Sequence, residues 1–387
     1  MKIVIAMDSF KGSLSAVEAG TAAKEGILEV YPDAEIAVCA LADGGEGTVR
    51  AIVGATGGRF ESVRVHDPLG RLITAEYGVI GCTGTVVMEM AEASGLTLLS
   101  EKERNPLETS TFGFGEMIAD AIDKGYRDFV IGIGGSATND GGFGMLRALG
   151  FDFLDRERRP IALGAKGLRA LSYIETANAL PALSECRFTV ACDVKNPLCG
   201  ENGCSAVFAP QKGASPEAVK EMDGLLARYA ALTEKAVGRD ESLSEGSGGA
   251  GGLGFAFLAY LGASLRSGAQ TVMEAVSLEE RVRDADVLIT GEGRLDFQSF
   301  MGKAPVEAAR IAKKYGKSVI ALAGAVSDRL ESGLIDAFFP IVGKPCTLDE
   351  AIDKEAAKTN MRRTAEQVFR LIRAAMRMRC EECETDG

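Results

Sequence analysis

The chain has 387 residues, 46% of them hydrophobic and 25% charged, and its formal net charge is −12. This length exceeds what one hydrophobic core usually serves, so we expect two domains. The acidic balance disfavours nucleic acid as a partner, and no stretch approaches the roughly 20 apolar residues of a membrane helix. Because His66 is the one histidine, the chain alone cannot form a zinc site with two histidines, and a general base is expected to be an aspartate or glutamate.

The nine cysteines, an odd number, are spread through apolar stretches and loops. This usage is typical of reduced thiols and predicts a cytoplasmic protein. Cys380 and Cys383 have the spacing of half a zinc site, but no second pair stands near them. We therefore interpret residues 381–387 as a tail.

The first 58 residues alternate strands with helices. Residues 2–6 and 34–41 are apolar runs typical of buried strands, and each leads into a helical pattern, the first of which spans 15–31. Ser15 and Glu18 have the spacing of a capping box for that helix. A β-α-β-α opening predicts a parallel, doubly wound sheet.

After residue 58 the pattern changes to hairpins. Short turns join three strands, expected at 60–65, 72–79 and 85–90, which indicates a mixed or antiparallel sheet in a second domain. Further elements expected in this part are strands at 187–192 and 206–208 and helices at 111–124, 216–237 and 255–261.

Residues 128–151 combine a short strand, a glycine loop and a helix start in the segment DFVIGIGGSATNDGGFGMLRALGF. This order lets backbone N–H groups face an anion at the positive end of a helix. The embedded hydroxyl, amide and carboxylate groups suit a metal–phosphate pair or a polar substrate. A tight turn in which glycines merely fit the bend is the structural alternative.

From residue 284 the alternation of strands and helices returns. We expect strands at 286–290, 318–324 and 337–342, and helices at 305–315, 327–333 and 348–378. Two strands before the hairpin region and three after it make five, the number of a flavodoxin-like sheet. The prediction is an α/β protein with a flavodoxin-like parallel sheet domain from both chain ends (1–58 and 284–380) and an inserted α/β domain of mixed sheet (59–283).

Polar residues follow the predicted strands, where open parallel sheets bind their ligands. The flavodoxin-like domain supplies Asp8, Ser9, Lys11, Ser13, Asp43, Glu46, Glu292, Arg294, Asp296, Gln298, Ser299 and Lys303. The inserted domain supplies Gly134, Gly135, Ser136, Thr138, Asn139, Asp140, Asp193 and Asn196. Glycine beside carboxylates and hydroxyls suits phosphate and Mg²⁺ binding. Neither the P-loop nor the dinucleotide fingerprint fits these loops in register.

Six ordered segments carry a resemblance to a known family: MDSFKGSLSA, LADGGEGT, GIGGSATNDGGFGMLRALG, DVKNPLCG, GGLG and GEGRLDFQSFMGKAP. Together they resemble type-I glycerate kinases from about residue 1 to residue 375. The resemblance implies ATP-dependent phosphorylation of D-glycerate with Mg²⁺, on a flavodoxin-like domain with an inserted α/β domain. Met7, where the family often has proline or a similar residue, and the CEEC segment are departures that leave the assignment unchanged.

Phosphoryl transfer needs cations around the γ-phosphate and a metal that bridges phosphate oxygens. Under this interpretation Lys11, Arg294 and Lys303 bind phosphate or the glycerate carboxylate, and Arg294 is the best planar clamp for the carboxylate. The candidates for Mg²⁺ are Asp43, Glu46, Glu292 and Asp296. We expect the reaction in the cleft between the two domains.

The reaction also needs a base near the attacking hydroxyl, which we expect to be Asp193 or Asp8. Asp193 is preferred because Asn196 could orient the substrate and Lys195 could reduce charge repulsion. The other hydroxyl, amide and glycine positions of these loops are assigned to substrate or phosphate binding. The favoured product is 2-phosphoglycerate, with 3-phosphoglycerate left open. A kinase of another small hydroxy acid, a nucleotide-dependent oxidoreductase and a non-catalytic phospholigand sensor are the alternatives.

Overall fold

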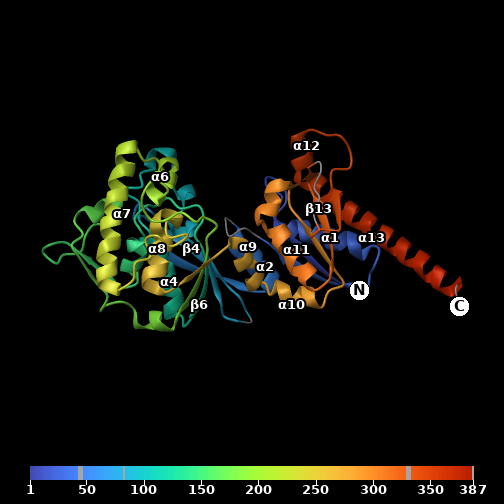
Figure 1. Ribbon diagram of the computed structural model, residues 1–387, viewed down its shortest axis with the longest axis horizontal. Coiled ribbons are helices and arrows are strands. Elements are labelled where there is room, and N and C mark those ends of the chain that lie inside the picture. Colours follow the sequence, from blue (N-terminus) through green and yellow to red (C-terminus); the bar gives the residue numbers. More distant parts are fainter. Residues whose placement is uncertain (42–46, 82, 328–332, 386–387) are drawn as a thin grey trace. The chain divides into compact units, whose positions relative to one another are not determined.

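The computed structural model describes residues 1–41, 47–81, 83–327 and 333–385 (Figure 1). The chain divides into two compact units, unit 1 from Met1–Asp43 and Val272–Gly387, and unit 2 from Gly44–Thr271. Unit 1 is therefore built from both chain ends, and unit 2 is one continuous segment. Within the described part of the chain, none of the helices has the length and apolar character needed to span a bilayer.

Unit 1 contains a five-stranded parallel sheet in the order β15-β13-β11-β1-β2. Its strands are β1 (Lys2–Met7), β2 (Glu35–Ala40), β11 (Val287–Gly291), β13 (Ser318–Ala323) and β15 (Ala337–Pro340). Numbered along the chain within this sheet, the order is 2-1-3-4-5, that of a flavodoxin-like fold. The predicted sheet is confirmed. The connections reverse direction between β1 and β11, which makes these neighbours the topological switch point.

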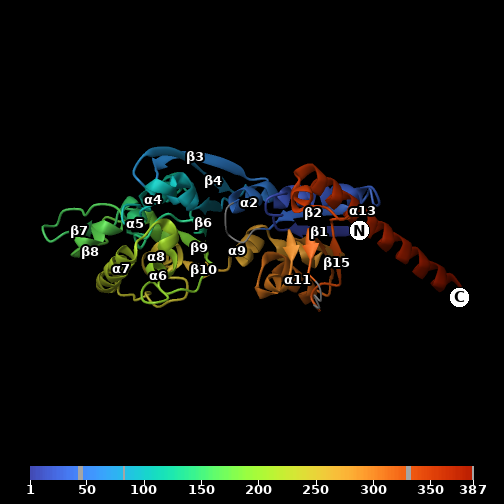
Figure 2. The same ribbon diagram turned by 90° about the horizontal axis from the view of Figure 1, so that it is seen from above.

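Helices cover both faces of this sheet, with α1 and α13 on one side and α11 on the other (Figure 2). The helices of unit 1 are α1 (Ala16–Leu28), α10 (Leu278–Arg283), α11 (Ala304–Lys314), α12 (Leu348–Ile352) and α13 (Lys354–Thr385). Right-handed crossovers that run in opposite directions from the switch point require this arrangement. A small sheet of β12 (Arg294–Leu295) and β14 (Ala325–Val326) lies beyond the ends of β11 and β13.

The first helix begins at the predicted cap. Ser15 Oγ accepts a hydrogen bond from Glu18 N at 3.3 Å, and Glu18 Oε2 accepts one from Ser15 N at 3.0 Å. Later in this helix, a Cβ added at Gly26 would lie 2.0 Å from the carbonyl oxygen of Arg362 in α13. Glycine at this position therefore allows the two helices to touch through their backbones.

The last predicted helix, 348–378, is two helices in the structure. Asp353 lies between α12 and α13 with φ −53° and ψ 127°, which is not helical. Its Oδ1 accepts a hydrogen bond from Ala356 N at 2.9 Å and so caps α13. An aspartate that bonds the backbone in this way favours a new helix start over continuation. Most of the helix expected at 327–333 lies outside the described residues.

Unit 2 contains a six-stranded mixed sheet in the order β10-β9-β6-β5-β4-β3, as the hairpin pattern predicts. The strands are β3 (Arg59–His66), β4 (Leu72–Val79), β5 (Val86–Glu89), β6 (Asp128–Gly132), β9 (Arg187–Ala191) and β10 (Ser264–Arg266). The pairs β3–β4 and β4–β5 are antiparallel, and the rest are parallel. A two-stranded sheet of β7 (Asp152–Leu154) and β8 (Tyr173–Glu175) completes the unit.

The helices of unit 2 are α2 (Thr48–Thr56), α3 (Ala91–Ser94), α4 (Phe112–Asp123), α5 (Phe143–Ala148), α6 (Cys204–Phe208), α7 (Pro216–Val237) and α8 (Gly249–Leu261); α9 (Gly268–Ala275) continues into unit 1. The strand predicted at 206–208 is wrong, because these residues belong to α6. Three apolar residues do not distinguish a strand from a buried helix turn. Packing against α7 and α8 decides the outcome here.

Helix α2 belongs to unit 2, although it was expected with the first domain. Val49 and Val53 pack over Gly78 of β4, where an added Cβ would lie 2.3 Å from Val53 Cγ2. The chain therefore enters unit 2 after Asp43 rather than after residue 58, and it returns at Val272. A strand–helix repeat does not reveal which sheet its last helix covers.

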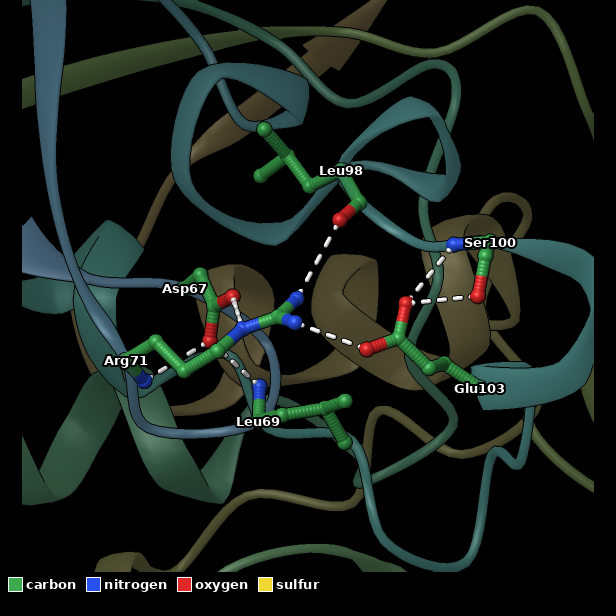
Figure 3. Close-up of polar contacts among 6 residues, drawn as sticks. All are labelled: Asp67, Leu69, Arg71, Leu98, Ser100 and Glu103. Atoms are coloured by element: carbon green, nitrogen blue, oxygen red, sulfur yellow. Dashed lines mark hydrogen bonds and ion pairs between the residues drawn. The ribbon is translucent and has the colours of Figure 1, made fainter.

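The turn between β3 and β4 is fixed by the side chain of Arg71 (Figure 3). Its Nε donates to Asp67 Oδ2 at 2.5 Å, and its other nitrogens donate to Glu103 Oε1 at 2.7 Å and to Leu98 O at 3.3 Å. The turn is also tied to the start of α4, because Ser110 N donates to Pro68 O at 2.9 Å. These contacts hold the segment before α4 in a fixed place, and the end of the loop after β6 is tied to that segment.

Candidate functional site

The loops after β1 and β11 meet at the switch point of unit 1. Asp8 follows β1, and its backbone N–H donates to Gly291 O at the end of β11 at 2.9 Å. A cavity of about 660 Å³ opens at these loops. Its polar part is lined by eight residues that the sequence places at the site: Asp8, Ser9, Lys11, Ser13, Glu292, Arg294, Asp296 and Lys303. The strand order explains why two segments far apart in the sequence converge here.

Glu292 places a buried carboxylate in the polar part of the cavity. Lys303, the residue just before α11, donates from Nζ to Glu292 Oε2 at 3.1 Å. The other oxygen, Oε1, is buried without a hydrogen-bond partner among the described residues, as is Ser13 Oγ. An unsatisfied buried polar atom costs about 1–3 kcal/mol. These two atoms therefore mark a place where a bound group would complete the hydrogen bonding.

Two further cations line the same cavity and are solvent-exposed. Lys11 is exposed, and the Arg294 side chain is 73% exposed, with its Nε 3.7 Å from Asp296 Oδ2. An exposed ion pair of this kind contributes little stability, so little energy opposes a change of partner when an anionic ligand arrives. Together with Lys303, these side chains place three cations in the polar part of the cavity, beside the carboxylates of Asp8, Glu292 and Asp296.

The remaining predicted residues of the loop after β11 are not placed in the cavity wall. Ser299 is buried, and its Oγ accepts a hydrogen bond from Asp296 N at 3.0 Å, so it shapes the loop. The side chain of Gln298 lies outside the described part of the structure, as do Asp43 and Glu46. Among the described residues there is no group of three or more His, Cys, Asp or Glu side chains arranged to hold a metal ion.

In unit 2, the loop after β6 has an exposed start and a buried remainder. Gly134 and Gly135 are exposed, whereas Thr138 and Asn139 are fully buried and Ser136 is 9% exposed. Thr138 Oγ1 and Asn139 Oδ1 have no hydrogen-bond partner among the described residues. The loop thus combines backbone accessible to a ligand with unsatisfied polar atoms beneath it.

Asp140 has an internal role, although the sequence assigns it to substrate binding. Its carboxylate accepts hydrogen bonds from Thr111 N at 2.9 Å, Thr111 Oγ1 at 3.0 Å and Gly142 N at 3.1 Å, and one from Ser110 Oγ. Complete burial raises the pKa of Asp140, and the backbone donors oppose that shift. The residue ties the end of the loop to the start of α4 rather than presenting a carboxylate to a ligand.

Lys212 is a polar residue at this loop that the sequence does not predict to be there. It ends the 3₁₀ helix η5 (Pro210–Lys212), is 2% exposed, and donates from Nζ to Ser136 Oγ at 2.6 Å and to Thr138 O at 2.7 Å. Burial lowers the pKa of Lys212 to about 8. No local pattern could reveal this role, because a lysine after Pro-Gln reads as an ordinary surface residue.

The glycine-rich first turn of α8, which is not helical in its backbone angles, packs against this loop. Ala250, Gly251 and Gly252 all have positive φ, and a Cβ added at Gly251 would lie 2.1 Å from Thr138 O. Gly141 N donates to Gly251 O at 2.9 Å, which joins the two segments. Glycine is required here because the two backbones approach each other more closely than a side chain allows.

Asp193 and Asn196 follow β9 in unit 2. Asp193 is exposed, and its Oδ1 accepts a hydrogen bond from Gly268 N, the first residue of α9, at 2.9 Å. Asn196 is half-buried, and its Nδ2 donates to Asn202 O at 2.8 Å. Lys195 pairs with Glu245 at 3.1 Å, and both are well exposed. The structure therefore gives Asn196 a loop-stabilising contact, and it leaves Asp193 accessible to solvent.

The fold and the switch-point cavity define an α/β enzyme with a binding site for a charged ligand. A family model described as the glycerate kinase family matches residues 3–373. A glycerate kinase from Haemophilus influenzae is 44% identical over 375 residues, which cover 96% of this chain and 99% of that protein. The glycerate 2-kinase of Escherichia coli is 44% identical over 381 residues, covering 97% and 99%.

A solved structure supports the same family assignment. A protein from Salmonella typhimurium LT2 assigned as glycerate kinase 2 superposes with a TM-score of 0.90 at 46% identity and covers 97% of this chain and 99% of its own. The chain belongs to the glycerate kinase family. The family resemblance inferred from the six sequence segments and the two-domain α/β fold are both confirmed.

Proposed function

We propose that this protein phosphorylates D-glycerate with ATP and Mg²⁺, and that 2-phosphoglycerate is the favoured product over 3-phosphoglycerate. The observation that carries the proposal is the hydrogen bonding of Glu292 in the polar part of the unit 1 cavity. One oxygen of its carboxylate is paired with Lys303, and the other, Oε1, has no hydrogen-bond partner among the described residues. A phosphate donor with a divalent cation supplies both the anion that the lysines attract and the cation that the carboxylate lacks. The relatives named as glycerate kinases support the acceptor.

The residues present fit Mg²⁺ in the way that phosphoryl-transfer enzymes hold it. Mg²⁺ is usually bound through one or two carboxylates, with phosphate and water completing its shell. Glu292 and Asp296 are the proposed protein ligands among the described residues, together with Asp43 and Glu46 of the loop after β2. When bound, the ion would neutralise charge on the phosphate oxygens. Lys11, Arg294 and Lys303 would bind and orient those oxygens.

The loops of unit 2 are proposed to bind the acceptor. Lys212 donates to Ser136 Oγ and so occupies a lone pair of that oxygen, which leaves the Ser136 hydroxyl proton for another acceptor. A glycerate carboxylate or phosphate oxygen meets this requirement. Asp193 is the proposed base, because it is exposed and the chain offers no histidine at these loops; Asp8 is the alternative base.

The proposal is tested by ADP release in a coupled assay with D-glycerate, L-glycerate and a panel of small hydroxy acids, each with and without Mg²⁺. We expect D-glycerate to give the highest kcat/KM, and we expect no turnover without a divalent cation. Phosphorus NMR of the product then distinguishes the 2-phosphate from the 3-phosphate. A higher kcat/KM for another hydroxy acid would identify that acid, rather than glycerate, as the substrate. Binding of NAD(P)H without ADP release would favour the oxidoreductase alternative.

The cysteine pattern supports a cytoplasmic location, which is part of this proposal.

A further inference from the structure

The unit 1 cavity has a second part that phosphate groups and a divalent cation do not need. This second part is apolar, unlike the polar loops, and is lined by Ile341 after β15 and by Leu348, Ala351 and Ile352 of α12. Phosphate groups and a metal ion are polar over their whole surface, so they gain nothing from aliphatic walls. A volume of about 660 Å³ lies within the roughly 300–1,000 Å³ of cofactor-sized pockets. The cavity is therefore larger and more apolar than the phosphate groups and the cation require.

The apolar part leaves large side chains in water. Leu348 is 75% exposed and Ile352 is 36% exposed, whereas Ile341 beside them is 3% exposed. The short helix α12 holds these side chains in place through a capping box, in which Thr347 Oγ1 accepts from Glu350 N at 3.3 Å and Glu350 Oε2 accepts from Thr347 N at 2.8 Å. Exposed aliphatic groups on a fixed element that is continuous with a polar pocket are typical of a ligand surface.

We propose that the apolar part of this cavity, formed by Ile341, Leu348 and Ile352, binds the adenine ring of the nucleotide whose phosphates occupy the polar part. The inference rests on the proposed use of a nucleoside triphosphate and adds where its base binds. A purine has two flat apolar faces and attached phosphates, so a single adenine nucleotide matches an aliphatic surface joined to Glu292, Lys303 and Lys11. The apolar end and the charged end lie in one unit, so no arrangement of the two units is needed to form the site.

Leu348→Asp tests the base contact without disturbing a core, because the side chain is mostly exposed in the absence of ligand. Burying a leucine side chain is worth about 1.5–3 kcal/mol, so we expect the Kd of Mg-ADP and the KM for ATP to rise at least ~10-fold. Binding of pyrophosphate, which has no base, should change less than about 2-fold. Leu371→Asp is the matched control, since Leu371 is 61% exposed on α13 and does not line the cavity. Wild-type affinity of Leu348→Asp for ADP would overturn the inference.

Cys346 provides an independent readout, because it is exposed and lines the same cavity. Its alkylation by a maleimide, followed by peptide mass spectrometry, should slow at least ~10-fold with saturating Mg-ADP and remain unchanged with pyrophosphate or glycerate. Equal labelling with and without ADP would contradict the inference. The two proposals fail separately. Protection of Cys346 by ADP without glycerate-dependent turnover refutes the kinase and supports the adenine site. Glycerate-dependent turnover without protection supports the kinase and refutes the adenine site.

Discussion

In the interior of unit 2, the ammonium group of Lys212 donates a hydrogen bond to Ser136 Oγ at 2.6 Å, across 76 positions of sequence. Among the described residues no carboxylate forms an ion pair with Lys212, which is 2% exposed. A buried ammonium without such a partner is costly to keep charged. Its presence beneath a loop that begins with two exposed glycines indicates that the loop, rather than the core, requires this residue.

Lys212 should make stability depend on alkaline pH. Burial lowers its pKa from 10.5 to about 8, so between these values the unfolded chain binds the proton and the folded chain does not. The free energy of unfolding should then rise as the pH increases through this window, by about 3 kcal/mol over the full range. Urea unfolding at pH 7.5 and pH 10 measures it. Lys212→Met should lose this increment, and an identical pH dependence in both proteins would contradict the assignment.

Glu292→Gln removes a negative charge from the cavity while keeping the shape of the side chain. If Glu292 Oε1 binds the cation that accompanies the phosphates, kcat/KM for ATP should fall at least ~100-fold, and more Mg²⁺ should be needed for half-maximal rate. Steady-state kinetics over a magnesium series checks this. Glu280→Gln on α10 is the control, because Glu280 is exposed and does not line the cavity. An unchanged magnesium requirement would remove Glu292 from the metal-binding set.

Asp193→Asn tests the proposed base. General-base loss costs roughly 100-fold or more in kcat, and the KM for ATP should stay within about 2-fold, because the substitution keeps the size of the side chain. The hydrogen bond from Gly268 N can still be accepted by the amide oxygen, so the start of α9 should be preserved. Asp8→Asn is the informative comparison. If Asp193→Asn turns over at the wild-type rate and Asp8→Asn does not, the base is Asp8.

Asp140→Asn should affect stability more than substrate binding. The amide nitrogen would face the N–H groups that now donate to Asp140 Oδ1 and Oδ2, so at least one buried donor loses its acceptor. We expect a loss of about 2–4 kcal/mol in the free energy of unfolding at pH 7. Urea unfolding measures it, with exposed Asp123→Asn at the end of α4 as the control, for which a change below about 0.5 kcal/mol is expected. Wild-type stability with a raised KM for glycerate would restore a substrate role for Asp140.

Much of the fold was predictable because local patterns and long-range packing agree. The helix expected at 216–237 is α7, which begins with Ser215 as its cap and ends before Gly238 at positive φ. The strand expected at 72–79 is β4. Where the two disagree the prediction fails. Residues 206–208 are apolar enough for a strand but pack as part of α6. The break between α12 and α13 at Asp353 depends on one side-chain hydrogen bond, which the hydrophobic periodicity of the sequence does not predict.

The site was predictable where chain topology determines it and not where side-chain direction does. Polar residues that follow β1 and β11 must converge once the strands are neighbours, so Asp8 and Glu292 could be placed from the sequence. The inward direction of the Asp140 side chain could not be predicted, because an aspartate in a glycine loop suits a ligand and a helix start equally well. Lys212 depends on a contact across 76 residues, and such contacts leave no local pattern.

The position of β1 in its sheet has a consequence for synthesis. One edge of this strand pairs with β2, but the other pairs with β11, where Ile3 lies opposite Val287. All of unit 2, Gly44–Thr271, is translated between these two strands. Unit 2 can therefore fold on the ribosome while three of the five strands of the unit 1 sheet are still to be translated, and β1 presents an unpaired edge throughout that time. This topology makes the first forty residues the segment most exposed to wrong strand pairing in a nascent chain.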